Sequence, residues 1–406
     1  MTPVRITSAL VDPSLLELPW NTPLEEWPAD HLVALPQGIS RHVVRFVKLH
    51  GTVYAVKETR ERIAEREYDL LRALERISAP AVEAVAIVAD RLSVDGESLE
   101  PVLVTRHLQF SLPYRAVFSH TLRPETMNRL LDALAALLVR MHLIGFFWGD
   151  CSLSNTLFRR DAGAFAAYLV DAETGALHLR LSNGQRSEDL EIARTNIFGE
   201  ALDLQAAGLL HDQIDPEHVS DEVVRRYETL WNEITFEERV EQDTRRYIEK
   251  RIRRLNELGF DVEEVAMSVV DNQVHVRPKV VDAGHHSRRL LRLTGLDAEE
   301  NQARSLLNDL DTYRAESDLP DESQAAHRWF TEVFEPVVRA VPPHLRRKLE
   351  PPELFVQVTD HRFRLSEEAG RDVGLAPAVQ SFLADVLVHR PDEQAILGYE
   401  PDEIAE

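Results

Sequence analysis

The sequence predicts an α+β protein in which a small β-rich part precedes a longer helical part. Two strand-like runs, 42–49 and 52–57, are joined by His50-Gly51, a dipeptide suited to a tight hairpin turn. Between residues 124 and 143, apolar side chains recur at helical spacing, and further helical patterns fill much of the second half of the chain. We therefore expect a sheet near the N-terminus and mainly helices after it.

A lysine ends the second strand of the expected hairpin, and a helix follows it. Lys57 closes the run Val-Tyr-Ala-Val-Lys, and the helix predicted from residue 61 to 74 comes directly after. Glu67 precedes the apolar Leu70 and Leu71 of that helix by three and four residues, so it points along the buried side, whereas Glu65 points away. We expect Glu67 to be the partner of Lys57.

The long helix at 124–143 leads into a polar loop that contains Asp150 and, five residues later, Asn155. An apolar, strand-like run, 166–170, then precedes Asp171. An Asp-x-x-x-x-Asn pattern alone is a weak signal, because polar loops often contain it by chance. The same pattern between an upstream lysine with its glutamate and a downstream aspartate is much harder to obtain by accident.

With these residues in this order, the segment from residue 32 to about residue 199 resembles the protein-kinase-like superfamily. It is most similar to the compact branch of aminoglycoside and choline phosphotransferases, RIO-type kinases and lipopolysaccharide (Kdo/WaaP-like) kinases. The whole chain resembles an uncharacterised actinobacterial family that adds a C-terminal domain of unknown function. The resemblance implies a bilobal kinase-like fold, with a small β-rich N-lobe and a helical C-lobe, followed by a mostly α-helical C-terminal domain.

The resemblance also implies a phosphotransferase that uses ATP and magnesium and a hydroxyl-bearing acceptor. In that interpretation Asp150 is the catalytic base, and Lys57, oriented by Glu67, holds the phosphates. The implied magnesium ligands are Asn155, Asp171 and Glu173, although a structural role for Glu173 is favoured. Phosphoryl transfer needs the charge of the triphosphate neutralised, which is why cations and carboxylates are the residue types involved.

Nucleotide contacts are expected from two further segments. The turn at 35–41 has the place of the loop that covers the phosphates, and its candidate residues are Gly38, Ser40 and Arg41. The last N-lobe strand, 102–108, runs into the expected hinge, where adenine would meet backbone groups of Arg106, His107 and Leu108. Arg41 has a plain alternative, which is a side chain that faces solvent.

Departures from the kinase pattern indicate which class of acceptor to expect. Trp148-Gly149 stands where many protein kinases have His-Arg before the catalytic aspartate, and the segment 177–186 after Asp171 is short. Both features favour a small molecule or sugar-like metabolite over a protein acceptor. Two other interpretations stay open: a nucleotide-binding pseudokinase that acts as a scaffold, and a kinase-fold enzyme that transfers AMP. The complete set of metal ligands counts against the first.

Length and composition fit this picture. The 406 residues allow several domains, and we expect an N-terminal extension (1–30), an N-lobe (31–108), a C-lobe (109–215), a mostly helical domain (216–390) and an acidic tail (391–406). The net charge of −23 argues against nucleic-acid binding. The single cysteine, the absence of a leader and the lack of an apolar run long enough to span a membrane favour a cytoplasmic protein.

The C-terminal half gives weaker signals. Residues 221–258 predict one or two long helices, 273–281 alternates like a strand, and 301–313 predicts a helix. His285-His286 with nearby arginines is a candidate anion site. We expect this half to recognise the substrate or a protein partner.

Overall fold

The structure is a computed structural model, and it describes residues 4–8, 13–34, 42–117, 124–210, 214–235, 238–240, 246, 249–250, 252–253, 255, 260–270, 273–393 and 396–397. The chain divides into two compact units. The first comprises residues 1–159, 167–225 and 394–406, and the second comprises residues 160–166 and 226–393. Each unit is described by itself.

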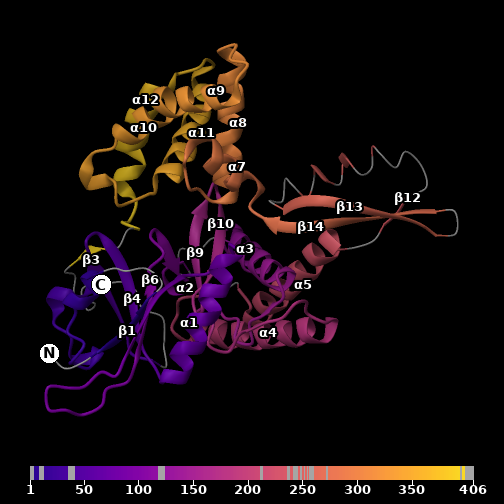
Figure 1. Ribbon diagram of the computed structural model, residues 1–406. Coiled ribbons are helices and arrows are strands. Elements are labelled where there is room, and N and C mark those ends of the chain that lie inside the picture. The colour runs from indigo at the N-terminus through magenta and orange to yellow at the C-terminus, as the bar shows by residue number, and fades with distance from the viewer. Residues whose placement is uncertain are drawn as a thin grey trace. The chain divides into compact units, whose positions relative to one another are not determined.

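The first unit begins with an antiparallel sheet of five strands in the order β1-β5-β6-β4-β3 (Figure 1). The strands are β1 (Arg5–Ser8), β3 (Val44–Leu49), β4 (Thr52–Glu58), β5 (Glu83–Ala89) and β6 (Val102–Arg106). Helix α1 (Glu61–Arg76) connects β4 to β5. The predicted β-rich N-terminal part is confirmed.

The β3–β4 hairpin has the expected two-residue turn. His50 and Gly51 have φ angles of 47° and 91°, so both are in the left-handed region that such turns require. The resulting register pairs Leu49 with Thr52 and Val44 with Lys57. The turn therefore fixes where Lys57 lies in the sheet.

Residues between β1 and β3 pack against the sheet. The short 3-10 helices are η1 (Pro13–Glu17), η2 (Leu24–Glu26) and η3 (Ala29–His31). They and their neighbours bury Leu15, Trp20 and Trp27 in the same core as the strand residues Val56 and Val104. Because these side chains belong to the core of the sheet, the N-terminal segment is an integral part of the first unit.

Helices make up most of the remainder of the first unit. They are α2 (Tyr114–Val117), α3 (Pro124–Leu143), α4 (Asn183–Ala206) and α5 (Pro216–Thr235), the last of which crosses the division between the units. Helix α3 has the predicted bounds and buries its apolar stripe, including Leu134, Leu138 and Met141. The short strands that complete the first unit, of which β9 and β10 extend into the second, are β2 (Val33–Ala34), β7 (Ser111–Pro113), β8 (Phe146–Phe147), β9 (Thr156–Asp161), β10 (Ala164–Leu169), β11 (Ala176–Leu177) and β15 (Ile396–Leu397).

The second unit combines a three-stranded sheet with a set of helices (Figure 1). The sheet has the order β12-β14-β13, from β12 (Glu238–Val240), β13 (Phe260–Val270) and β14 (Gln273–Ala283). The helical elements are α7 (His285–Thr294), α8 (Glu300–Glu316), α9 (Glu322–Trp329), the π-helix η4 (Phe330–Phe334), α10 (Glu335–Arg339), η5 (Pro343–Leu345), α11 (Pro351–Ala369), α12 (Leu375–Asp385) and η6 (Leu387–His389). The prediction of a mostly helical C-terminal part is confirmed.

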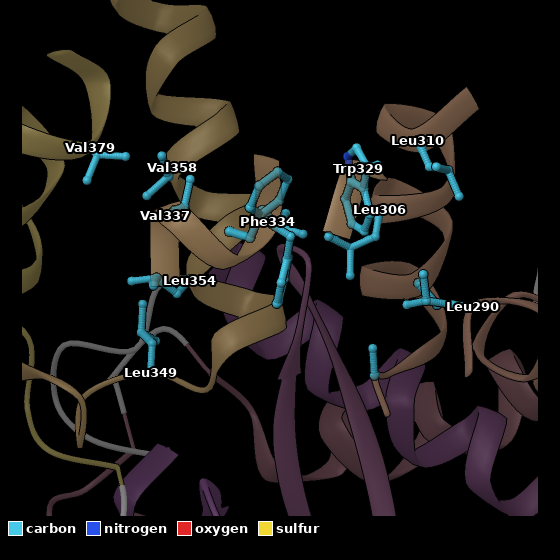
Figure 2. Packing of buried hydrophobic residues seen from close by; sticks show 14 of the residues in the cluster. Leu290, Leu306, Leu310, Trp329, Phe334, Val337, Leu349, Leu354, Val358 and Val379 are labelled. Atoms are coloured by element: carbon cyan, nitrogen blue, oxygen red, sulfur yellow. The ribbon is translucent and has the colours of Figure 1, made fainter. Parts of the chain in front are cut away.

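The helices of the second unit enclose one apolar core. Trp329 and Phe334 lie at its centre with their ring centroids 5.7 Å apart, and leucine and valine side chains from α8, α11 and α12 surround them (Figure 2). Aromatic side chains of this size supply a large share of the buried apolar area. The core therefore holds the helices of this unit together.

One expectation for this half of the chain is wrong. Helices were predicted throughout 221–258, but α5 ends at Thr235 and β12 follows at Glu238, paired antiparallel with β14. Pairing with a distant strand outweighs local helix propensity here, as tertiary context often does. The predicted strand at 273–281 is present as β14. In the described part of the chain, no helix is long and apolar enough to cross a membrane.

Candidate functional site

Three carboxylates converge on Lys57. The Lys57 Nζ atom lies 3.0 Å from Glu67 Oε2, 2.7 Å from Asp171 Oδ2 and 3.3 Å from Glu173 Oε2. Strand β4 supplies the lysine, α1 supplies Glu67, and the turn after β10 supplies the other two. Four residues singled out from the sequence thus lie together, although up to 116 positions separate them along the chain.

The charges of this cluster do not balance. Glu67 is 2% exposed, and burial, reinforced by the nearby Asp171, raises its pKa to about 8, while Lys57 partly opposes that rise. Burial alone would lower the pKa of Lys57, but the charges of Glu67 and Asp171 outweigh it and raise that pKa. Three carboxylates therefore surround a single ammonium group, which cannot neutralise all of their negative charge. Oxygen atoms of Glu67, Asp171 and Glu173 lie within 4.8 Å of one another, which is a donor set suited to a hard cation such as magnesium.

Glu173 also contacts a histidine. His42 Nε2 lies 3.3 Å from Glu173 Oε2, and the backbone N–H of Glu173 donates to Asp171 Oδ1 at 2.9 Å. These contacts hold Glu173 at the edge of the lysine cluster. They are compatible with either role that the sequence left open, a structural carboxylate or an additional ligand.

Two amide side chains hold the carboxylate of Asp150. Asn155 Nδ2 donates to Asp150 Oδ2 at 3.1 Å and to the Asp150 carbonyl at 3.0 Å. On the other side, Asn196 Nδ2 donates to Asp150 Oδ1 at 2.9 Å. Each carboxylate oxygen therefore accepts a hydrogen bond from one of the two amide groups, and an ionised carboxylate is a pure acceptor that can also accept a hydrogen bond from a hydroxyl. This arrangement suits a group that orients a hydroxyl.

Helix α4 supports the loop that carries Asp150. Asp189 is 0% exposed and accepts the backbone N–H groups of Trp148 and Gly149 at 2.7 and 2.8 Å, with the His142 ring at 3.0 Å. Further along α4, Glu200 accepts the N–H groups of Leu153 and Ser154 at 2.6 and 3.0 Å, and burial raises its pKa. Both ends of the loop are thus fixed by carboxylates from a single helix.

The α4 residues were not recognised from the sequence. Asp189, Asn196 and Glu200 are spaced by seven and four positions, so they share one face of a helix. The same helix buries Ala193 and Ile197 next to them. Polar residues recurring at helical spacing within an apolar stripe are a signal that sequence reasoning can use, since burial of such groups requires partners.

The Trp148-Gly149 departure from the kinase pattern has a structural role. The Trp148 side chain is buried, and its Nε1–H donates to the Asp171 carbonyl at 3.1 Å. Thr174 Oγ1–H donates in turn to the Trp148 carbonyl at 2.9 Å. Gly149 has a φ of +74°, and a Cβ atom there would lie 3.0 Å from the Phe147 ring. The dipeptide therefore ties the loop of Asp150 to the segment of Asp171.

The expected nucleotide contacts are located only in part. Gly38, Ser40 and Arg41 lie outside the described residues. The His107 N–H donates to the Val53 carbonyl at 2.9 Å, and burial lowers the pKa of its imidazole to about 4. Arg106 ends β6 and forms an ion pair with Glu83 at 3.1 Å, and Leu108 follows the strand end by two residues. The backbone N–H of His107 is thus already hydrogen-bonded within the first unit.

In the second unit, a glutamate of the chain itself occupies the candidate anion site at His285-His286. Glu300 accepts the backbone N–H groups of His286 and Ser287 at 2.9 and 3.0 Å, at the start of α7. Its Oε1 atom also lies 2.6 Å from His286 Nδ1. Burial opposes ionisation, but these hydrogen bonds lower the pKa of Glu300. A carboxylate of the chain itself therefore occupies the position that an external anion would take.

Two family models match two successive segments of the chain, in the order that the sequence predicts. Residues 47–208 match the family model described as the lipopolysaccharide kinase (Kdo/WaaP) family, and residues 229–387 match a domain of unknown function, DUF4032. The predicted resemblance, a protein-kinase-like part joined to a C-terminal part of unknown function, is confirmed. No curated protein matches the chain.

Many solved structures are similar to this chain, and one of them illustrates the likeness. It is described as WaaP in complex with acyl carrier protein, and the alignment covers 63% of this chain and 99% of that one at 17% identity and a TM-score of 0.37. This likeness is too distant to bear on function.

Proposed function

We propose that this chain is a phosphotransferase that moves the γ-phosphoryl group of ATP, with magnesium, to a hydroxyl of a small or sugar-like acceptor in the cytoplasm. The single observation that carries the proposal is the convergence of Lys57, Glu67 and Asp171, next to a loop in which Asp150 and Asn155 are mutually fixed. The match of this region to a kinase family model supports the reaction class. Because that family is one of lipopolysaccharide kinases, the match also favours a sugar-like acceptor over a protein.

The carboxylate cluster fits a magnesium site. Asp171 and Glu173 offer hard oxygen donors, and Asn155, whose amide nitrogen donates to Asp150, would supply its amide oxygen as a further ligand. Bound magnesium would neutralise charge that develops on the phosphate oxygens. Glu67 is almost fully buried behind Lys57 and is better placed to orient that lysine.

The remaining roles follow from the hydrogen bonds. Lys57 would exchange its contact with Asp171 for the phosphates and keep Glu67 as its partner. Asp150, held on both sides by amide groups, would accept the proton of the acceptor hydroxyl. Asp189 and Glu200 keep the loop rigid, so that Asp150 is already oriented when the acceptor binds. Adenine would meet backbone groups near Arg106 and Leu108.

The direct test uses ATP, magnesium and a panel of sugars and small alcohols, with mass spectrometry of the products. We expect an added phosphoryl group in the wild type and a loss of about 10²–10⁴-fold in rate for Asp150→Ala, which removes the proposed base. Asp221→Ala is the matched control, because that exposed carboxylate pairs only with Arg194 among the contacts seen for it.

Three outcomes would contradict the proposal. An added adenylyl group would mean that the chain transfers AMP. Full activity in Asp150→Ala would remove the assigned role of that residue. Nucleotide binding without any product across the panel would favour the scaffold interpretation.

A further inference from the structure

The β9–β10 hairpin connects two of the proposed magnesium ligands, Asn155 and Asp171. Asn155 directly precedes β9, and Asp171 follows β10 by two residues. At the base of the hairpin, the Val170 N–H donates to the Asn155 carbonyl at 3.0 Å. The pairing of the two strands therefore sets the relative position of Asn155 and Asp171.

The tip of this hairpin, residues 160–166, belongs to the second unit. Its two-residue turn consists of Ala162 and Gly163, with φ angles of 51° and 81°. A left-handed conformation costs an alanine about 1 kcal/mol or more relative to glycine, so something must hold Ala162 in it. The Ala162 N–H donates to Glu353 Oε2 at 2.8 Å, and its side chain packs against the helical core.

Asp161, the last residue of β9, is bound to the start of α8. It is 3% exposed, and its Oδ1 accepts the Gln302 N–H at 2.7 Å while its Oδ2 accepts Asn301 Nδ2 at 2.8 Å. These bonds place a carboxylate at a helix N-terminus, which is a favourable position for negative charge. A buried carboxylate without such donors would be costly.

Gln302 connects the hairpin to α11 as well. Its side chain is buried, and Nε2 lies 2.8 Å from the Arg160 carbonyl, 2.9 Å from Glu350 Oε1 and 3.0 Å from Glu353 Oε2. Glu353 in turn accepts both Gln302 and Ala162 through the same oxygen. Since the members share partners, displacing the turn would leave several buried polar groups unsatisfied at once.

We propose that Asp161, Gln302 and Glu353 are positioning residues for the magnesium ligands at the base of the β9–β10 hairpin. The helices of the second unit fix the turn, the turn fixes the register of two six-residue strands, and the register fixes Asn155 against Asp171. A slip of one residue would invert the faces of both strands, so register is a property that the tip can control. The inference rests on the proposed function and gives the DUF4032 region a part in it.

The test compares the full chain with Asp161→Ala by two measurements. The first is hydrogen exchange at the Val170 amide, which reports pairing at the base of the hairpin. The second is the magnesium concentration that gives half of the ATP-induced thermal stabilisation. We expect exchange at Val170 to be about tenfold faster and the magnesium midpoint to rise about tenfold, because a buried donor set loses its acceptor.

Three variants make the comparison specific. Asp161→Asn keeps an oxygen for the Gln302 N–H, and its NH2 group can donate to Asn301 if that amide turns its oxygen towards it, so both readouts should stay near the wild-type values. Asn301→Ala removes one contact and should shift both in the same direction by a smaller factor, which covers the case in which Asp161→Ala does not fold. Asp372→Ala removes an exposed ion pair with Arg362 in the same unit and should change neither.

The possible outcomes distinguish a failure of the positioning role from a failure of the proposed function. A wild type that responds to magnesium-ATP, with Asp161→Ala and Asn301→Ala showing the same magnesium midpoint, contradicts the positioning role alone. Unchanged exchange at Val170 in both variants also contradicts it. A wild type without any magnesium-ATP response overturns the proposed function, and the positioning role falls with it.

Discussion

Asp189 and the lysine cluster are two places where the first unit buries carboxylate charge, and they do so in opposite ways. Asp189 has three donors for its two oxygens, two backbone N–H groups and the His142 ring. Around Lys57, three carboxylates share one ammonium group. In the first arrangement both carboxylate oxygens have donors, whereas the second has an excess of negative charge.

This difference distinguishes a carboxylate with a structural role from carboxylates that are suited to bind a cation. A buried carboxylate whose oxygens are both hydrogen-bonded does not need a cation as its partner, so we interpret Asp189 as a support for the loop of Asp150. An excess of carboxylates costs stability in the free protein and is relieved when a cation binds. The same residue type therefore has different consequences in the two regions, and removing one carboxylate from each should have effects of opposite sign.

The largest effect is expected at Asp189. Asp189→Ala leaves two backbone N–H groups and His142 without their acceptor inside the protein. We expect the free energy of unfolding to fall by about 3–5 kcal/mol, which is the usual cost of breaking a buried polar pair from one side. Urea unfolding followed by tryptophan fluorescence measures it, with Asp221→Ala as the exposed control. A change no larger than that of the control would mean that Asp189 is not a support.

A second effect, which depends on pH, is expected at Glu67. Its pKa is about 8 in the folded chain against an ordinary 4.5, so the folded state holds a proton that the unfolded chain releases. The stability linked to this group is fully present below about pH 4.5 and is lost as the pH rises through 8. Glu67→Gln removes that loss, so its stability relative to the wild type should increase from pH 5 to pH 9.

Thermal unfolding of both proteins across this pH range measures the difference. Glu65→Gln is the matched control, because Glu65 lies on the exposed side of the same helix. A constant difference between Glu67→Gln and wild type at all pH values would contradict the charge excess around Lys57.

Sequence reasoning predicted those parts of the site that lie in regular local patterns. The His50-Gly51 turn, the β-branched strand that ends at Lys57 and the helical stripe beside Glu67 each follow from local chemistry. The order of these elements then carried the resemblance to kinases. Features that depend on local patterns can therefore be predicted well from the sequence.

The features that escaped prediction depend on contacts between distant segments. Asp189 acquires its role only because α4 packs under a loop some forty residues earlier, as its bonds to Trp148 and Gly149 show. Strand β12 forms where helix propensity is good, because β14 offers a partner. Asp161 and Gln302 meet across 141 positions. Spacing along a chain does not reveal such partners, whereas burial and hydrogen bonding do.

The central claim, that the Lys57 cluster is a magnesium-nucleotide site, is tested most directly by thermal unfolding of the wild type and Asp171→Asn, with and without magnesium-ATP. At a hundred times its dissociation constant, a ligand adds about 2.7 kcal/mol to the folded state. We predict a rise in Tm that needs both magnesium and ATP in the wild type and is absent in Asp171→Asn. No rise in the wild type, or an equal rise in the variant, would contradict the account.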